Sequence, residues 1–387
     1  MDELSWGGII LRAFIRFWPV WAALAVTYGL SIRYRRRLGL YGQLFDSPVG
    51  MIGFGVVMFW VFTAFFAGAI VTHDPLAQLS GMKNALPGVP VRNPGDGIYP
   101  WYLLGGDTLA RDVFSRMVMG AREVLKIAPT ATLFAFMVGI TLGVPAGYYA
   151  GRLDSLLSFV ANLVLAFPVI LLFYLLVTPE IVQTGIPVWF AAVLFICPVI
   201  FLVVLVNSRF RMMPRKRNLY VGIILVLGLW MYAGLAFNLD PTGTFSMSPN
   251  MLNVFVAVVF VNAPGVFRIV RGLVMDLKAR DYVSAAQTRG EGPWYVMLWE
   301  ILPNARGPLI VDFCLRIGYT TILLGTLGFF GLGVSPESPD WGSTINAGRR
   351  LLAMYPHAAL VPALALMSLV LGLNLLADGL REESLKD

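Results

Sequence analysis

Apolar stretches of about 20 residues alternate with shorter polar segments along most of the chain. A membrane-spanning α-helix needs about 20 mostly apolar residues, so each such stretch predicts one span. A ninth stretch, 7–31, is interrupted by Arg12 and Arg16, and it predicts either a further span or an amphipathic helix in the membrane interface. We expect spans at about 48–72, 126–150, 155–178, 187–207, 219–238, 251–272, 308–332 and 358–377.

Basic clusters predict how these spans are oriented, because short cytoplasmic loops are enriched in Lys and Arg. The clusters at 33–37 and 209–217 are therefore expected in the cytoplasm, together with the segment 281–310 and the C-terminal tail. The outer segments are expected to be 73–125, 238–250 and 333–357. The first of these has many turn residues and leads into an amphipathic helix.

The composition agrees with a polytopic, all-α, multi-pass membrane protein, since 58% of the residues are hydrophobic and 13% are charged. The net charge of +7 is explained by the basic cytoplasmic loops, so no nucleic-acid partner is expected. Cys197 and Cys314 lie in apolar stretches, and His73 and His357 are far apart in the sequence. The sequence therefore predicts no disulfide and no metal site.

Small residues recur at every fourth position of the span 126–150 and place a flat ridge on one helix face. Such a ridge lets a second helix approach closely. The ridge consists of Ala131, Ala135, Gly139, Gly143, Gly147 and Gly151.

The polar segment 281–310 separates two strongly apolar stretches. Asp281 favours a helix start, the alanines at 285 and 286 favour helix, and Gly290 predicts its end. A second helix is expected until Pro303, where the chain turns back toward the membrane. By physical chemistry alone the segment is either a docking element or an ordinary surface loop.

The sequences "SAAQTRG" and "ILPNARGPLIV" in this segment resemble the cytoplasmic signature of ABC importer permeases. In that family the loop forms a coupling helix, which fits a groove on the ATP-binding subunit. Ser284 stands where the family usually has glutamate, which removes an ionic contact from the family pattern. The resemblance implies ATPase coupling through Asp281, Tyr282, Ser284, Ala285, Ala286, Gly290, Leu302 and Pro303.

Two further stretches resemble dipeptide, oligopeptide and nickel permeases. The sequence "LGGDTLARDVFSRMVMGAREVL" precedes the second core span, and "SPDWGSTINAGRRLL" and "LGLNLLADGLRE" resemble the end of the second-type (C-type) permease subunit. The resemblance implies a type I permease bundle with a six-span core. In the first stretch the matching residues are Gly106, Asp107, Arg111, Asp112, Ser115, Arg116, Gly120, Ala121 and Arg122.

Two or three spans are additional to this core, and the hairpin 187–238 accounts for two of them. Lateral packing against a partner or lipid is the expected role of this hairpin. We divide the chain into an N-terminal segment with a basic cytoplasmic cluster, the first part of the core, the inserted hairpin, and the coupling loop with the last core spans and tail. Their bounds are 1–47, 48–178, 179–250 and 251–387.

No Gly-x-x-x-x-Gly-Lys-Ser/Thr phosphate loop occurs in the chain. The resemblance implies a non-catalytic permease subunit of the bacterial inner membrane, with ATP and Mg on partner ATPases and no cofactor bound by this chain. The implied partners are a homologous permease, two ATP-binding cassette subunits, an external substrate-binding protein and membrane lipid. Peptides are the commonest cargo implied, with nickel chelates and other small solutes as alternatives; export of peptides is also known in the family.

Three polar residues fall within predicted spans. Asp312 and Arg316 are four residues apart, and they either form a salt bridge or line the transport path. Asn262, near Pro264, marks either a packing kink or a helix irregularity near the path.

Two other functional classes fit the sequence poorly. An ion-driven secondary transporter needs relays of acidic or histidine residues within the membrane, and it needs internal repeats. The sequence shows no such repeat, and Asp312 is the single acidic residue within the predicted spans. A membrane-embedded enzyme needs a Ser-His, His-Glu or metal-ligand cluster near a span, and none is found in the sequence.

Overall fold

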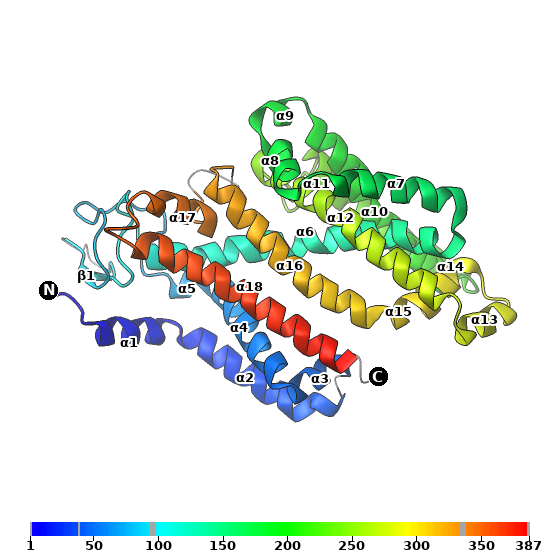
Figure 1. Cartoon of the computed structure of the whole chain (residues 1–387), viewed down its shortest axis with the longest axis horizontal. Helices are drawn as coiled ribbons and strands as arrows, with labels where there is room; N and C mark the ends of the chain where they lie inside the picture. Colours follow the sequence, from blue (N-terminus) through cyan, green and yellow to red (C-terminus); the bar gives the residue numbers. More distant parts are fainter. Residues whose placement is uncertain (1, 38, 93–96, 333–337, 385–387) are drawn as a thin grey trace. The chain divides into compact units, whose positions relative to one another are not determined.

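A computed structural model describes residues 2–37, 39–92, 97–332 and 338–384 (Figure 1). Within these ranges seven helices are long and apolar enough to cross a membrane, or nine spans if each of two bent helix pairs counts as one. The predicted all-α, multi-span fold is therefore confirmed. Parts of the predicted outer segments 73–125 and 333–357, and the last three residues of the tail, lie outside the described residues.

The chain divides into two compact units that differ from the four segments expected from sequence. The first unit combines Met1–Pro129 with Cys314–Asp387, and the second is Thr130–Phe313. Two long helices, α6 (Val113–Tyr149) and α16 (Arg306–Phe329), each contribute residues to both units.

In the first unit, α18 lies along α4, as Figure 1 shows, and the Trp60 indole donates a hydrogen bond of 2.9 Å to the Ser368 hydroxyl between them. A two-stranded antiparallel sheet belongs to the outer segment. The other elements of this unit are short helices and loops. Besides the first part of α6 and the last part of α16, the unit contains α1 (Trp6–Arg16), α2 (Trp18–Tyr34), η1 (Arg35–Arg37), α3 (Leu40–Gln43), η2 (Leu44–Asp46), α4 (Pro48–Phe65), α5 (Ala67–Ile70), β1 (Val89–Pro90), β2 (Trp101–Tyr102), α17 (Trp341–Arg349) and α18 (His357–Ser384).

The stretch 7–31 forms two helices, α1 and α2, which meet at an angle of 58° near Phe17. Trp6, Ile10 and Phe14 of α1 are largely exposed. A short helix with exposed apolar side chains and arginines suits the membrane interface. The bend favours an interfacial α1 followed by a more deeply inserted α2.

The second unit is a helical bundle that contains the predicted hairpin and the polar cytoplasmic segment. The hairpin forms as expected, from α10 and α11, although α11 begins within the basic cluster 209–217. Besides parts of α6 and α16, the unit contains α7 (Gly151–Ala166), α8 (Val169–Val177), α9 (Pro179–Gln183), α10 (Ile186–Arg209), α11 (Pro214–Phe237), α12 (Pro249–Leu277), α13 (Asp281–Thr288), α14 (Pro293–Tyr295), the π-helical segment η3 (Val296–Ile301) and α15 (Leu302–Asn304).

Two predicted helices have a different form in the structure. The span expected at 155–178 is bent, because it consists of two helices, α7 and α8, which meet at an angle of 87°. Pro168 begins the second helix and supplies no backbone N–H for continuing the first. The amphipathic helix expected before residue 126 is continuous with the following span, so α6 has 37 residues and is about 55 Å long.

The predicted ridge of small residues is confirmed as a packing surface on α6, with the exception of Gly151. Gly151 lies beyond the end of α6, at the start of α7, where it is exposed and no heavy atom lies within 4 Å of a Cβ built on it. A Cβ atom on Gly139 would lie 2.6 Å from Val266 Cβ, and one on Gly147 would lie 2.7 Å from the Arg271 carbonyl oxygen. Real Cβ atoms are essentially never so close to other heavy atoms, so only glycine allows α12 to approach α6 at these points. This contact fixes the helix from which the polar cytoplasmic segment emerges.

Candidate functional site: the loop between α12 and α16

The predicted short helix is present as α13, and its two faces differ in burial. Val283 and Ala286 are fully buried in a hydrophobic cluster that includes residues of η3, α6 and α12. Ser284 and Ala285 are exposed on the opposite face, as is Thr288. The outer face of α13 is therefore small and polar, without a bulky side chain that would keep another surface at a distance.

Gly290 ends α13, as predicted, in a left-handed conformation with φ of +81°. Its N–H donates to the Gln287 carbonyl at 2.9 Å, and the Glu291 N–H donates to the Ala286 carbonyl at 3.3 Å. These two hydrogen bonds form a Schellman motif, which satisfies carbonyls at the helix end. No heavy atom beyond its neighbours lies within 4 Å of a Cβ built on Gly290, so the requirement for glycine comes from the backbone alone.

The second half of the loop differs from the prediction at Leu302 and Pro303. Leu302 has helical dihedral angles (φ −59°, ψ −40°) although a proline follows it, and the helix continues through Asn304. The preceding turn has π-helical spacing. A proline and a π-helical turn are each recognised causes of a helix irregularity, and both occur in this part of the loop.

Polar contacts hold the loop against itself and against α6. Arg289, just after α13, forms an ion pair of 2.8 Å with Glu300 in η3. The Lys278 ammonium donates to the carbonyls of Gly147 and Tyr148 at 2.9 and 3.3 Å. A cation at the C-terminal end of α6 also interacts favourably with that helix dipole.

Among the predicted coupling residues, Tyr282 differs because its side-chain hydroxyl is buried. Its ring packs against the hydrophobic cluster, and burial raises the pKa of its hydroxyl. This hydroxyl is buried and makes no hydrogen bond to any described residue. A buried polar group without a hydrogen-bond partner costs free energy, so this hydroxyl does not stabilise the fold.

The three polar residues expected within spans lie in α12 and α16, away from α13 in the sequence. Asn262 is buried and its amide donates to the Val258 carbonyl of its own helix at 3.0 Å. Asp312 and Arg316 are both half-buried on α16. Their role in lining a path stays a prediction. Among the described residues, no three His, Cys, Asp or Glu side chains form a group that could hold a metal ion.

In the first unit, the motif at 104–125 contacts the motif that begins at Ser338. The Arg116 guanidinium donates to the Thr344 hydroxyl at 3.0 Å and to the Ser338 carbonyl at 3.0 Å. The Trp341 indole donates to the Met117 carbonyl at 2.8 Å, and its ring leaves no room for a side chain at Gly120. These residues stabilise the fold of this unit and are buried rather than available to a partner.

The remaining matched residues of this motif also have structural roles. Asp107 pairs with Arg111 at 2.7 Å, and the Ser115 hydroxyl donates to Asp112 at 2.6 Å. Asp112 also lies 3.4 Å from the imidazole of His73. Gly106 and Ala121 are buried, whereas Arg122 is exposed.

Sequence reasoning missed the contacts between the hairpin and the loop. The Trp299 indole of η3 donates to the Ser208 hydroxyl of α10 at 3.1 Å, and the Arg209 guanidinium lies 4.8 Å from the centre of the Trp299 ring. Arg209 belongs to the basic cluster 209–217, whose composition predicts only the orientation of the neighbouring spans. Nothing in the local sequence pattern indicates which distant side chain it contacts.

Comparison with known proteins gives consistent matches. The family described as "Binding-protein-dependent transport system inner membrane component" matches residues 210–382. The glutathione transport system permease protein GsiD of Pectobacterium atrosepticum is 30% identical over 290 residues, covering 75% of this chain and 73% of that protein. The dipeptide transport system permease protein DppC of Alkalihalophilus pseudofirmus is 27% identical, covering 88% and 87%. The di/tripeptide transport system permease protein DppC of Pseudomonas aeruginosa is also 27% identical, covering 91% and 93%.

Proposed function

The chain belongs to the family of binding-protein-dependent inner-membrane permeases of ABC importers, and we propose that it transports peptides or related small solutes by coupling to ATPases through α13. Permeases of this family are multi-pass, non-catalytic subunits that work with ATPase and substrate-binding partners. The relatives favour this function over an ion-driven secondary transporter.

The observation that supports α13 as the docking element is the difference between its faces. Ala286 and Val283 hold the helix to the protein, while Ser284 and Ala285 present a small, exposed surface. A partner groove can approach such a helix closely, because short side chains do not separate the two surfaces. The hydroxyl of Tyr282 is buried without a hydrogen-bond partner among the described residues, and we propose that a group of the docked ATPase reaches it.

In the proposed mechanism, two ATPase subunits bind ATP and Mg²⁺, and this chain binds no cofactor. One ATPase docks on α13 and the other docks on a homologous permease that completes the transport path. ATP binding closes the ATPases and moves the loop 281–303, which shifts the core spans from inward-facing to outward-facing. An external binding protein delivers the substrate.

Peptides are the proposed cargo because the relatives that match most of this chain are named for dipeptide, di/tripeptide and glutathione transport. Glutathione is itself a small peptide, so the three names share one substrate class. Import is the proposed direction, since the matching family is defined by dependence on a binding protein. Nickel chelates are a less supported alternative cargo.

The decisive experiment is affinity purification of the tagged chain from its native membrane, with partners identified by mass spectrometry and vanadate-sensitive ATP hydrolysis measured. Ala285→Arg places a long side chain on the exposed face of α13 and should abolish recovery of the ATPases. Ala285→Ser is the matched control and should retain them. Recovery of the same ATPases with both variants would contradict docking at this face, and a wild-type chain without ATPases that still moves solute would contradict the whole proposal.

A further inference from the structure

The hairpin α10–α11 contacts the candidate coupling loop directly, in addition to its contact with α6. The two helices of the hairpin differ in their contacts. Helix α10 packs on α12, α14 and η3 and contacts α6, whereas the principal contact of α11 is α10. Apolar side chains of α11, among them Leu219, Val226 and Leu227, are exposed as expected for a surface toward lipid.

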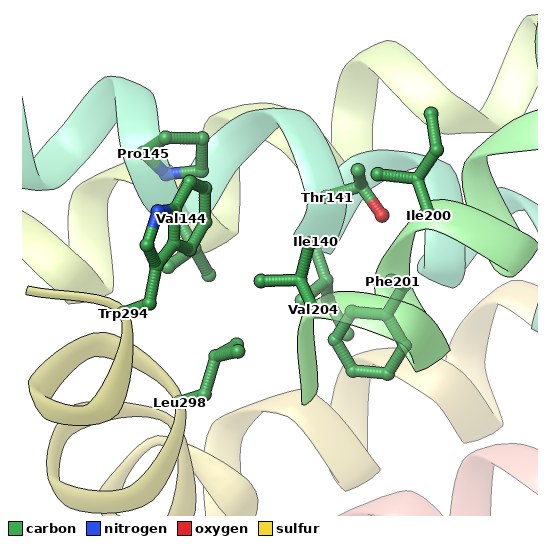
Figure 2. A pocket seen from close by; sticks show the side chains of 9 residues that line it. All are labelled: Ile140, Thr141, Val144, Pro145, Ile200, Phe201, Val204, Trp294 and Leu298. Carbon is green, nitrogen blue, oxygen red and sulfur yellow. The ribbon is translucent and has the colours of Figure 1, made fainter. Parts of the chain in front are cut away.

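The cytoplasmic half of α10 packs against η3 with apolar side chains. Phe201, Val204 and Leu205 contact the buried cluster that includes Val296, Met297, Leu298 and Ile301 of η3. Figure 2 shows α10, α6 and the loop around a small pocket of about 30 Å³, into which Phe201 and Val204 point from α10 and Leu298 from η3. This contact is part of the hydrophobic core of the second unit.

The last turn of α10 adds directional contacts to the apolar ones. Ser208 accepts the hydrogen bond from the Trp299 indole, and Arg209 covers the same ring as a cation over an aromatic face. Arg209 also donates to the Tyr295 hydroxyl at 3.4 Å. In addition, a Cβ atom on Gly292 would lie 2.7 Å from Arg211 Nη1, so the connection between α13 and α14 passes close to the basic cluster.

The contacts of Trp299 fall on the π-helical segment η3, which lies between α14 and α15 in the connection from α13 to the span α16. π-helical turns are rare in helices and are found mainly at functional positions. Trp299 lies within this turn, and its orientation is determined by Ser208 and Arg209. A support at this point would keep the second half of the loop rigid while a force acts on α13.

We propose that Ser208 and Arg209 of the hairpin are positioning residues that hold η3 in place, so that movement of α13 is transmitted to α16 instead of being lost within the loop. This inference rests on the proposed function, because it assumes an ATPase docked on α13. The hairpin is then a support for coupling inserted between the core spans, rather than a passive lipid-facing addition.

The test uses the assembled transporter in nanodiscs and measures amide hydrogen exchange with and without ATP and vanadate, which needs no knowledge of the cargo. Docking is reported by protection of 281–288, and transmission by the nucleotide-dependent change in exchange at 300–310. In Arg209→Ala the protection of 281–288 should remain, while the nucleotide-dependent change at 300–310 should fall by about two- to fivefold. Arg209→Lys keeps a cation over the ring and should recover part of this loss.

Arg215→Ala is the matched control, since Arg215 is an exposed member of the same basic cluster whose removal changes the charge equally. It should behave as the unmodified chain. Trp299→Phe removes the hydrogen bond to Ser208 and weakens the contact with Arg209, so its combination with Arg209→Ala should cause a smaller loss at 300–310 than the sum of the two single losses. That double variant separates loss of this contact from general destabilisation.

Equal behaviour of Arg209→Ala and Arg215→Ala would overturn the proposal, and so would loss of the protection at 281–288 in Arg209→Ala. Failure of the proposed function gives a different result, in which the unmodified chain shows no protection of 281–288 when the ATPases are added.

Discussion

Arg289, which follows α13, and Glu300 of η3 form an ion pair of 2.8 Å that closes the two halves of the candidate coupling loop on each other. The loop is otherwise held by the buried contact of Val283 and Ala286 with η3. The apolar contact supplies most of the stabilisation, because Arg289 is largely exposed and surface ion pairs contribute only about 0–1 kcal/mol. The ion pair instead links the end of α13 to η3.

Exchanging the two charges tests this ion pair. Arg289→Glu and Glu300→Arg alone each place like charges together and should reduce ATP-driven transport, with a loss in thermal stability of at most about 1 kcal/mol. The double exchange should restore most of the activity. Transport by reconstituted complexes and the unfolding temperature of each variant are the measurements; a double variant no better than the singles would show that the pair is not used.

Gly290 is required for its backbone conformation rather than for space. Gly290→Asn should therefore be tolerated better than Gly290→Val, because asparagine enters the left-handed region more readily and the β-branched side chain hardly at all. We expect a cost of about 1–2 kcal/mol for an ordinary residue at this position. Faster amide exchange of α13 in the valine variant would confirm the order, and equal exchange in both would contradict it.

The hydroxyl of Tyr282 has no hydrogen-bond partner among the described residues. Removing it by Tyr282→Phe should leave the stability of the isolated chain unchanged or slightly higher, since no hydrogen bond is lost. If the ATPase supplies the partner, its affinity should fall about fivefold, the usual value of one hydrogen bond. Titration of the ATPase onto the immobilised permease measures this, and an unchanged affinity would place Tyr282 outside the contact.

The close packing of α12 on α6 can be tested by substituting two glycines, one that lies in the contact and one that has no neighbouring heavy atom. Gly139→Ala forces a Cβ atom against Val266 and should destabilise the protein by about 1–3 kcal/mol. Gly272→Ala, on α12, meets no heavy atom within 4 Å and should be neutral or stabilise the helix by about 0.5–1 kcal/mol. Unfolding temperatures in detergent distinguish the two, and an equal loss for both would show that helix contact is not the cause.

The segment between α11 and α12 contains a carboxylate whose pKa depends on its hydrogen bonds. The Phe245 N–H donates to Asp240 at 2.7 Å and, with donors from Thr242 and from the Trp230 indole, lowers the pKa of Asp240 from 3.8 to about 2. A lowered pKa means that this stabilisation is complete above pH about 4 and is lost as the pH falls toward 2. Trp230 fluorescence should change over this range in the unmodified chain.

Asp240→Asn is the control for this titration, because the asparagine side chain does not ionise. The difference in fluorescence between the two chains isolates Trp230 from the other tryptophans. A transition near pH 4 or above in the unmodified chain would show that the hydrogen bonds to Asp240 are not maintained in solution.

Apolar periodicity and charge by themselves determined the multi-span, all-α class, the hairpin 187–238, most of the ridge of small residues and the bounds of α13. These features depend on residues close together in the sequence: a helix start at Asp281, a left-handed glycine at 290, a small residue at every fourth position. The family resemblance then pointed to the same loop and to a permease.

Only the tertiary structure decided which faces of these elements are buried and which distant residues meet. Ala285 and Ala286 are identical and adjacent, yet one is exposed and the other fully buried, because η3 packs on one side of α13 only. The contact of Trp299 with Ser208 and Arg209 likewise joins residues that are about 90 positions apart in the chain. A local pattern reports the preference of a segment for helix and for lipid, whereas its neighbours in space are selected by the packing of all the segments together.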